Sequence, residues 1–273
     1  MMSTRTRHRL LGTYVGLLVF YLLAPVAVMV VFSFNASESL MRLDGLSLRW
    51  YETFFADERL VRGLWISLGL ALVTVLVSAV IGTLMAFGLA RSRMRGKSAV
   101  EGAMLLPMIT PDILLAVAML MLFTQAFLWK PGLLTVAIGH VTLGLVYMTV
   151  AVRARLVTIG RSAEEAARDL GASPGAAIGL VVMPQLWPTI VTSGLLIFAV
   201  SLDDFSISLF NSGQGNQPLP VLIWSMLRFG VTPEINAAGT VICLLTLLTL
   251  TAFLVARRRQ GAGARMDGFG DAF

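Results

Sequence analysis

Charged residues are scarce in this chain. Only 13% of its 273 residues are charged, whereas soluble proteins use about one quarter. Hydrophobic residues make up 57% of the sequence, and the mean hydropathy is +0.83. There are too few polar residues to cover a soluble domain, so we expect lipid to be part of the solvent of this protein.

Cysteine and histidine are also nearly missing. The single cysteine, Cys243, excludes an intrachain disulfide, and no residues with the spacing of metal ligands occur. The sequence has no Gly-x-x-x-x-Gly-Lys-Ser/Thr run, so we expect ATP to be hydrolysed elsewhere and no cofactor on this chain. No Ser/His/Asp set is visible in the sequence either. The net charge of +6 does not indicate nucleic-acid binding, because the basic residues form short clusters beside apolar segments.

Long apolar runs dominate what is present. A membrane-spanning helix needs about 20 apolar residues, and the first run is too long for the core of a signal peptide, which is about 7–15 residues. We therefore predict an all-α, polytopic membrane protein with six transmembrane helices between residues 10 and 256. The six segments are 10–34, 64–90, 103–129, 133–152, 189–210 and 237–256.

Basic residues are unevenly divided between the two sides of these spans. Most of the 21 Lys and Arg residues fall in 1–9, 91–98, 153–188 and 257–273, which share one side. The positive-inside rule then places both termini in the cytoplasm. We expect the Gly-rich tail, 257–273, to be disordered. The basic residues on the opposite side are Arg42, Arg49, Arg59, Arg62, Lys130 and Arg228.

Two segments on the opposite, outer side carry amphipathic patterns. The loop over 35–63 contains Trp50 and Tyr51, and its pattern predicts a short helix at the membrane interface. The segment 211–233 begins with Gly and Asn and continues into an amphipathic run over 219–229. We expect this second run to lie at the membrane surface or to dip into it.

The longest inner segment, about 153–188, contains a predicted helical hairpin. Residues 164–170 are rich in Ala, Glu and Arg, which favour a helix, and Gly171 suits the left-handed residue that ends one. Ser173 can cap a second helix that has Pro174 at its first position and runs on to Pro184. Such a hairpin either docks on another protein or remains solvated, and the local pattern leaves both open.

The spacing within this hairpin resembles the EAA loop of ABC importer permeases. In that family, Glu-Ala-Ala is followed by three residues, Gly, nine residues, Ile, one residue and Leu-Pro; here Val181 replaces Ile and Met183 replaces Leu. The resemblance implies a type I ABC importer permease fold and a coupling helix seated in a separate ATPase subunit. The coupling positions it implies are Glu165, Ala166, Ala167, Gly171 and Pro184.

Further segments resemble the spermidine/putrescine permeases, and specifically the second permease subunit and the putrescine-type member. The resemblance implies a homologous permease partner, two ATPase copies that bind ATP and Mg²⁺, and an extracytoplasmic binding protein. It also implies a bacterial inner (plasma) membrane location, contact with membrane lipid and no nucleic-acid partner. The matching segments are 32–35, 49–51, 111–112, 201–205 and 230–237.

Three carboxylates within the predicted spans are candidates for solute contact. Placing an ionisable residue in a span costs about 2.5–3.5 kcal/mol, which makes it a functional-site hypothesis. Asp112, Asp203 and Asp204 lie about 20–24 Å along outward-running helices at 1.5 Å per residue, where they could receive the ammonium groups of a polyamine. Local roles stay open: Asp112 can bond backbone groups freed by Pro111, Asp203 can accept hydrogen bonds from a neighbouring helix, and Asp204 can face outer water as a helix-end residue.

Two further residues have two readings each, and a third has one. Trp50 can contact solute through cation–π attraction or anchor the chain at the interface. Glu234 can meet a binding protein or cap a helix. His140 is expected to be a hydrogen-bonded packing residue.

Other functions remain as alternatives to polyamine import. A relative with this pattern could carry a different small cation or organic solute. An ion-gradient-driven carrier often shows two related repeats, which this sequence lacks. An intramembrane enzyme would need a catalytic pair such as His with a carboxylate, and a scaffold would bind no solute.

Overall fold

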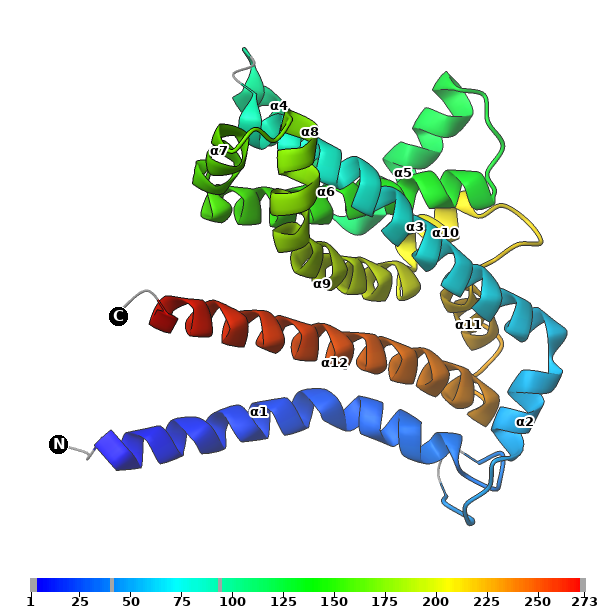
Figure 1. Cartoon of the computed structure of the whole chain (residues 1–273). Helices are drawn as coiled ribbons and strands as arrows, with labels where there is room; N and C mark the ends of the chain where they lie inside the picture. The colour runs from blue at the N-terminus through cyan, green and yellow to red at the C-terminus, as the bar shows by residue number, and fades with distance from the viewer. Residues whose placement is uncertain (1–3, 40–41, 93–94, 271–273) are drawn as a thin grey trace. The chain divides into compact units, whose positions relative to one another are not determined.

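A computed structural model describes residues 4–39, 42–92 and 95–270 (Figure 1). These residues are mostly helical. Among them, β-type pairing occurs only as one isolated antiparallel bridge between Asn35 and Leu46. The helical elements are α1 Thr4–Ser33, α2 Arg49–Ala56, α3 Glu58–Arg91, α4 Lys97–Ile109, α5 Asp112–Met121, η1 Leu122–Ala126, α6 Leu133–Ile159, α7 Ser162–Asp169, α8 Pro174–Ala177, η2 Ile178–Val182, α9 Met183–Leu202, α10 Ser206–Asn211, α11 Leu219–Leu227 and α12 Pro233–Gly270.

Among the described residues, five helical segments are long and apolar enough to cross a membrane, and there are six if the bent pair α4–α5 counts as one span. This agrees with the predicted all-α membrane fold. The short helices expected in the outer segments are present as α2 and α11. Arg93, one of the predicted cytoplasmic basic residues, lies outside the described residues.

The chain divides into two compact units. One comprises Met1–Val61 and Ile223–Cys243, and the other comprises Arg62–Leu222 and Leu244–Phe273. The second unit contains α5 to α10 and most of α3, and therefore both the candidate carboxylates and the inner hairpin. This second unit therefore holds most of the candidate functional residues.

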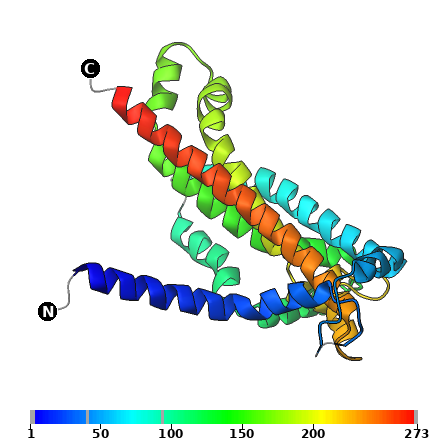
Figure 2. The same cartoon turned by 90° about the horizontal axis from the view of Figure 1, so that it is seen from below.

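The core of the second unit is formed by α3, α6 and α9. Figure 1 and Figure 2 both show α6 and α9 side by side, in agreement with the closely packed pairs between them. Met148 and Leu186 are among the fully buried side chains at this seam. At Gly144 a Cβ atom would collide with the Ser78 hydroxyl of α3, so a residue without a side chain is needed where the helices approach.

The third predicted span is not one continuous helix, which corrects the expectation for 103–129. It breaks between Ile109 and Asp112, and the two halves are bent by 111°. Pro111 has no N–H to donate, and the residue before a proline disfavours helical geometry, so Thr110 adopts an extended conformation. Asp112 consequently starts a new helix instead of lying midway along one.

The fifth predicted span, 189–210, is also broken. α9 ends at Leu202, and α10 begins at Ser206. Asp203 and Asp204 therefore lie in the break between two helices. At its N-terminal end, this helical segment begins earlier than predicted, because α8, η2 and α9 follow one another without interruption from Pro174.

The tail differs from expectation as well. α12 continues as a helix to Gly270, whereas the sequence predicted disorder from residue 257 onward. The Ala and Arg residues between 256 and 265 favour a helix, and in this tail they outweigh the glycines.

Candidate functional site

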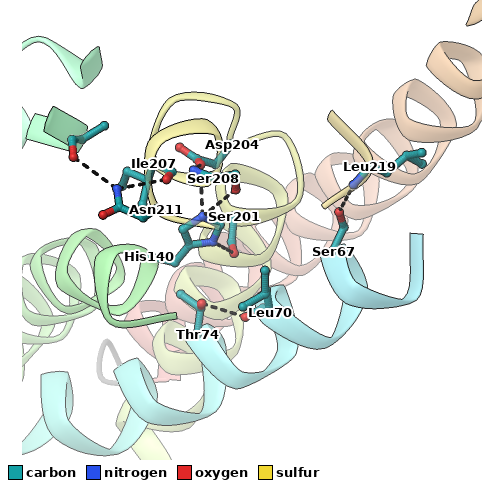
Figure 3. Close-up of polar contacts among 11 residues, drawn as sticks. Ser67, Leu70, Thr74, His140, Ser201, Asp204, Ile207, Ser208, Asn211 and Leu219 are labelled. Carbon is teal, nitrogen blue, oxygen red and sulfur yellow. Dashed lines mark hydrogen bonds and ion pairs between the residues drawn. The ribbon is translucent and has the colours of Figure 1, made fainter. Parts of the chain in front are cut away.

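A hydrogen-bonded cluster links α6 to both sides of the break between α9 and α10 (Figure 3). The Nδ1 atom of His140 lies 2.7 Å from Ser201 Oγ, at the end of α9. Its Nε2 atom lies 3.0 Å from Asp204 Oδ2 and 3.3 Å from Ser208 Oγ on α10. The imidazole is buried, with 3% of the residue exposed, so this cluster is shielded from bulk solvent.

The partners of the imidazole decide where its proton lies. A carboxylate only accepts hydrogen bonds, so Nε2 carries the proton shared with Asp204. In the neutral ring Nδ1 then accepts from the Ser201 hydroxyl. Asp204 Oδ2 also accepts the backbone N–H of Ser208 at 2.9 Å, which gives a partner to one of the N–H groups that the first turn of a helix leaves unpaired. The buried carboxylate therefore has the partners that burial requires.

The two neighbouring carboxylates at the break have different surroundings. The Asp204 side chain is 13% exposed and is committed to His140 and Ser208. Asp203 is exposed, and no described residue forms a hydrogen bond or ion pair with its carboxylate. Of the predicted pair, Asp203 is thus the one whose carboxylate is available to a cation.

The fold assembles a Ser/His/Asp set that was not visible in the sequence, which corrects the expectation that none is present. Its members are separated by 61 and 64 residues, so no local spacing reveals them. A nucleophile needs a neighbouring space for a substrate. The cavity beside His140 and Ser201 measures only about 20 Å³, which holds roughly one water molecule. The cluster is therefore an internal hydrogen-bonded network with room beside it for about one water molecule.

α10 is anchored on its other side by Asn211. The side-chain amide of this residue donates to the carbonyls of Ala116 on α5 and Ile207, at 3.2 and 3.1 Å. Its backbone carbonyl accepts from Thr135 on α6 at 2.8 Å. The short helix after the break is therefore held from both ends, by Asp204 and by Asn211.

Asp112 lies apart from this cluster. It is exposed in the first turn of α5, where a negative charge is favoured by the helix dipole. No described residue forms a hydrogen bond or ion pair with its carboxylate. The structure does not join Asp112 to Asp203 in one site within this chain.

Trp50 belongs to the first compact unit and is mostly buried, at 7% exposed. Its indole N–H donates to the carbonyl of Asn35 at 2.7 Å, and the guanidinium of Arg49 stacks on its ring at 4.6 Å from the centroid. Asn35 in turn holds its own loop by donating to the Arg42 carbonyl and accepting from the Asp44 N–H. In this conformation Trp50 fixes the outer loop, and its cation–π partner is Arg49. Glu234 occupies the first turn of α12.

The inner hairpin forms as its sequence predicts. Gly171 has a φ of +92°, and the backbone N–H of Ala172 bonds to the carbonyl of Ala167 at 3.0 Å, which is the Schellman arrangement at a helix end. The Ser173 hydroxyl accepts the backbone N–H of Ala176 and caps α8. Figure 2 shows α7 and α8 joined at the tip of this hairpin.

Ion pairs attach this hairpin to α3. The Arg91 guanidinium lies 3.0 Å from the Glu164 carboxylate and donates to the carbonyl of Gly160 at 3.0 Å. Arg161 donates back to the carbonyl of Arg91 at 3.2 Å. The sequence did not assign a role to Glu164, because the neighbouring Glu165 fits the EAA pattern.

The outer surface of the hairpin is open. Glu165 and Ala166 are exposed, and Leu170 is 90% exposed beside the turn. A groove of about 530 Å³ runs next to it and is lined by Arg91, Glu164 and Glu165, among others. The exposed residues and this groove leave that face of the hairpin uncovered by the rest of the described chain.

These features agree with one protein family. Residues 78–261 match the family described as binding-protein-dependent transport system inner membrane component. This segment covers more than half of the chain and includes α6, the hairpin and the α9–α10 break. The chain belongs to this family of multi-pass inner-membrane permease components.

Individual relatives extend the match to most of the chain. It is 37% identical over 228 residues to the putrescine transport system permease protein PotI of Escherichia coli (strain K12), covering 81% of each chain. It is 36% identical over 241 residues to the spermidine/putrescine transport system permease protein PotC of Haemophilus influenzae, covering 88% of this chain and 93% of the relative. Identity to PotC of Escherichia coli (strain K12) is 32% over 256 residues, covering 94% and 97%.

Solved structures show the same fold. The chain matches a bacterial ABC transporter involved in import of the acidic polysaccharide alginate with a TM-score of 0.70 and 15% identity, over 94% of this chain and 95% of the other. It matches the MetNI methionine ABC transporter with a TM-score of 0.60 and 21% identity, over 73% and 95%. The fold is that of a type I ABC importer permease.

Proposed function

We propose that this chain is the permease subunit of an ATP-driven importer that carries a polyamine, putrescine or spermidine, into the cytoplasm. The observation that carries the proposal is the exposed, unpaired carboxylate of Asp203 at a helix break. A polyamine carries two or more ammonium groups separated by methylene chains, so it needs carboxylates and apolar surface. The polyamine names of the 32–37% identical relatives support the same solute.

Asp203 acts in this proposal as the first acceptor of an ammonium group. Pairing between an ammonium and a carboxylate is stronger where bulk water is partly excluded than at an open surface. Asp112 and Trp50 remain proposed solute contacts: Asp112 is already exposed, whereas Trp50, at 7% exposed, becomes available only when the outer loop rearranges. Asp112 and Asp203 share no partner in this chain. We therefore assign them to different ammonium groups of the solute or to different stages of its passage through the membrane.

The inner hairpin couples transport to ATP hydrolysis. We assign Glu165, Ala166, Ala167, Gly171 and Pro184 to this coupling surface. Two copies of an ATPase, which bind ATP and Mg²⁺, drive the movement of the hairpin, while a second homologous permease subunit completes the pathway. An extracytoplasmic binding protein delivers the solute, and both termini of this chain lie in the cytoplasm.

The test is solute-stimulated ATP hydrolysis and uptake by the reconstituted complex over a panel of amines. We expect putrescine or spermidine to stimulate hydrolysis more than monoamines or neutral diols of the same length. Asp203→Asn should reduce uptake of labelled putrescine by about tenfold, the effect of losing one charge-assisted contact, while the subunits still copurify. Equal stimulation by a neutral diol would reject a polyamine as the solute.

A different small cation or organic solute is the remaining candidate. It would be supported if Asp203→Asn reduced the uptake of that solute and left polyamine uptake at its background level. Transport by the isolated chain without an ATPase would instead indicate an ion-gradient-driven carrier.

A further inference from the structure

We propose that His140 is a positioning residue for transport. By holding Asp204 at the break between α9 and α10, it fixes the position of the neighbouring Asp203 carboxylate. The functional part of this inference rests on the proposed role of Asp203 in meeting the solute. The positioning itself does not depend on which solute is carried.

The first argument is that one buried ring connects three elements. His140 belongs to α6, Ser201 to the last turn of α9 and Ser208 to α10. The ring nitrogens lie within 2.7–3.3 Å of side chains on both sides of the break. Removing the imidazole would leave a buried carboxylate without this partner, which is costly because nearby water is limited to a cavity of about 20 Å³.

The second argument concerns the backbone at the break. Between Leu202 and Ser206 the helical ladder is interrupted, so side-chain contacts must fix the direction of the chain there. Asp204 supplies this contact by accepting from both His140 and the Ser208 N–H. Together these bonds set the angle at which α10 follows α9.

The third argument is that the two carboxylates are consecutive. With Asp204 turned toward α6 and mostly buried, the side chain of Asp203 is left exposed. If Asp204 were released, the Ser208 N–H of α10 would lose its partner and the break would no longer present a single carboxylate in a fixed place. A preorganised charge binds a cation more tightly than a mobile one, because less ordering entropy is lost on binding.

His140 does not itself meet the solute. Both ring nitrogens are occupied by protein side chains, and the residue is 3% exposed. Its effect on transport must therefore pass through the residues that it holds.

The single cysteine of the chain allows a direct labelling test of this geometry. In a Cys243→Ser background, Asp203→Cys is labelled with a cationic methanethiosulfonate reagent in the assembled complex. We expect His140→Leu to change the labelling rate by about tenfold, the effect of losing a hydrogen bond to a charged group. His140→Gln, which can both donate and accept, should restore most of the original rate.

Two controls accompany this test. Gln214→Cys lies in the exposed loop after α10, and its labelling rate should be the same with His140 and with His140→Leu. Thr142→Ala removes a side-chain hydrogen bond that stays within α6. It should leave the labelling rate of Asp203→Cys unchanged. Where His140→Leu does not assemble, Ser201→Ala removes only the Nδ1 partner and should shift the rate in the same direction by less. An equal labelling rate of Asp203→Cys with the native His140, with His140→Leu and with Ser201→Ala would overturn the proposal.

A double-mutant cycle on transport tests the link to Asp203. We expect His140→Leu to raise the KM for labelled putrescine by about tenfold, and to add little in an Asp203→Asn background, because the two changes act through one carboxylate. Additive effects on KM would reject the link. If the parent complex carried neither putrescine nor spermidine, the proposed function would fail, whereas the labelling result would still decide the role of His140.

Discussion

The Arg91 guanidinium and the Glu164 carboxylate lie 3.0 Å apart and join the end of α3 to the inner hairpin. Both side chains are about one-fifth exposed, so water screens this pair less than a surface ion pair. The contact gives the hairpin a defined attachment to a membrane helix, which is what transmission of a push from an ATPase requires.

We expect Arg91→Ala to weaken this attachment by about 1–2 kcal/mol, a value between those of exposed and buried charge-assisted pairs. The amount of solute carried per ATP hydrolysed should fall, because the hairpin can then move without α3. Exchanging the charges in Arg91→Glu with Glu164→Arg should recover part of the coupling. Lys97→Gln is the matched control, since its 4.0 Å pair with Glu101 contributes little; an equal loss there would contradict the assignment.

Gly171 is the second test of the hairpin. Its φ of +92° is unfavourable for residues with a side chain, so Gly171→Ala should cost about 1–2 kcal/mol and disturb the turn between α7 and α8. ATP hydrolysis should continue with less transport. Gly179→Ala serves as a control, because its backbone is not in the left-handed region and a Cβ there meets no neighbour. Unaltered coupling in Gly171→Ala would show that the turn geometry does not matter for docking.

Trp50 can be assigned by separating stability from affinity. Trp50→Phe keeps the ring but leaves the Asn35 carbonyl without its 2.7 Å partner, which should cost about 1–3 kcal/mol and lower the Tm of the purified complex. The KM for putrescine should change little if Trp50 only holds the outer loop. A higher KM at an unchanged Tm would instead place Trp50 in contact with the solute.

The orientation in the membrane can be measured with single cysteines. In a Cys243→Ser background, we expect Gln214→Cys to react with a membrane-impermeant thiol reagent in intact spheroplasts, and Ser162→Cys on α7 to react only after the membrane is opened. Both positions are exposed in the structure, so access to the reagent depends on sidedness. The reverse pattern would place the hairpin outside and remove the basis for coupling to a cytoplasmic ATPase.

The sequence predicted the features that depend on local chemistry. Length and apolarity predicted the helices, and the hairpin end at Gly171 and the cap at Ser173 were both confirmed. These features need only neighbouring residues. The likeness to polyamine permeases was likewise confirmed by the related sequences.

The features that the sequence missed depend on contacts between distant residues. Hydropathy does not distinguish a continuous span from one that bends by 111° at Thr110 and Pro111. The local alternatives for the two aspartates were also the wrong way round: Asp204, not Asp203, bonds a neighbouring helix, and Asp203, not Asp204, is exposed. The difference arises from His140 on α6, which no local pattern shows. The attachment of Glu164 to Arg91 spans more than 70 residues and has no local signature.

The break at Thr110 and Pro111 has a mechanical consequence. α4 packs on α6, whereas α5 packs mainly on α10. Because no helical ladder crosses the break, torque on one half is not passed to the other. The half that packs on α10, beside Asp203 and Asp204, is joined to the other half through the extended Thr110–Pro111 segment, which makes this segment the natural hinge of the span.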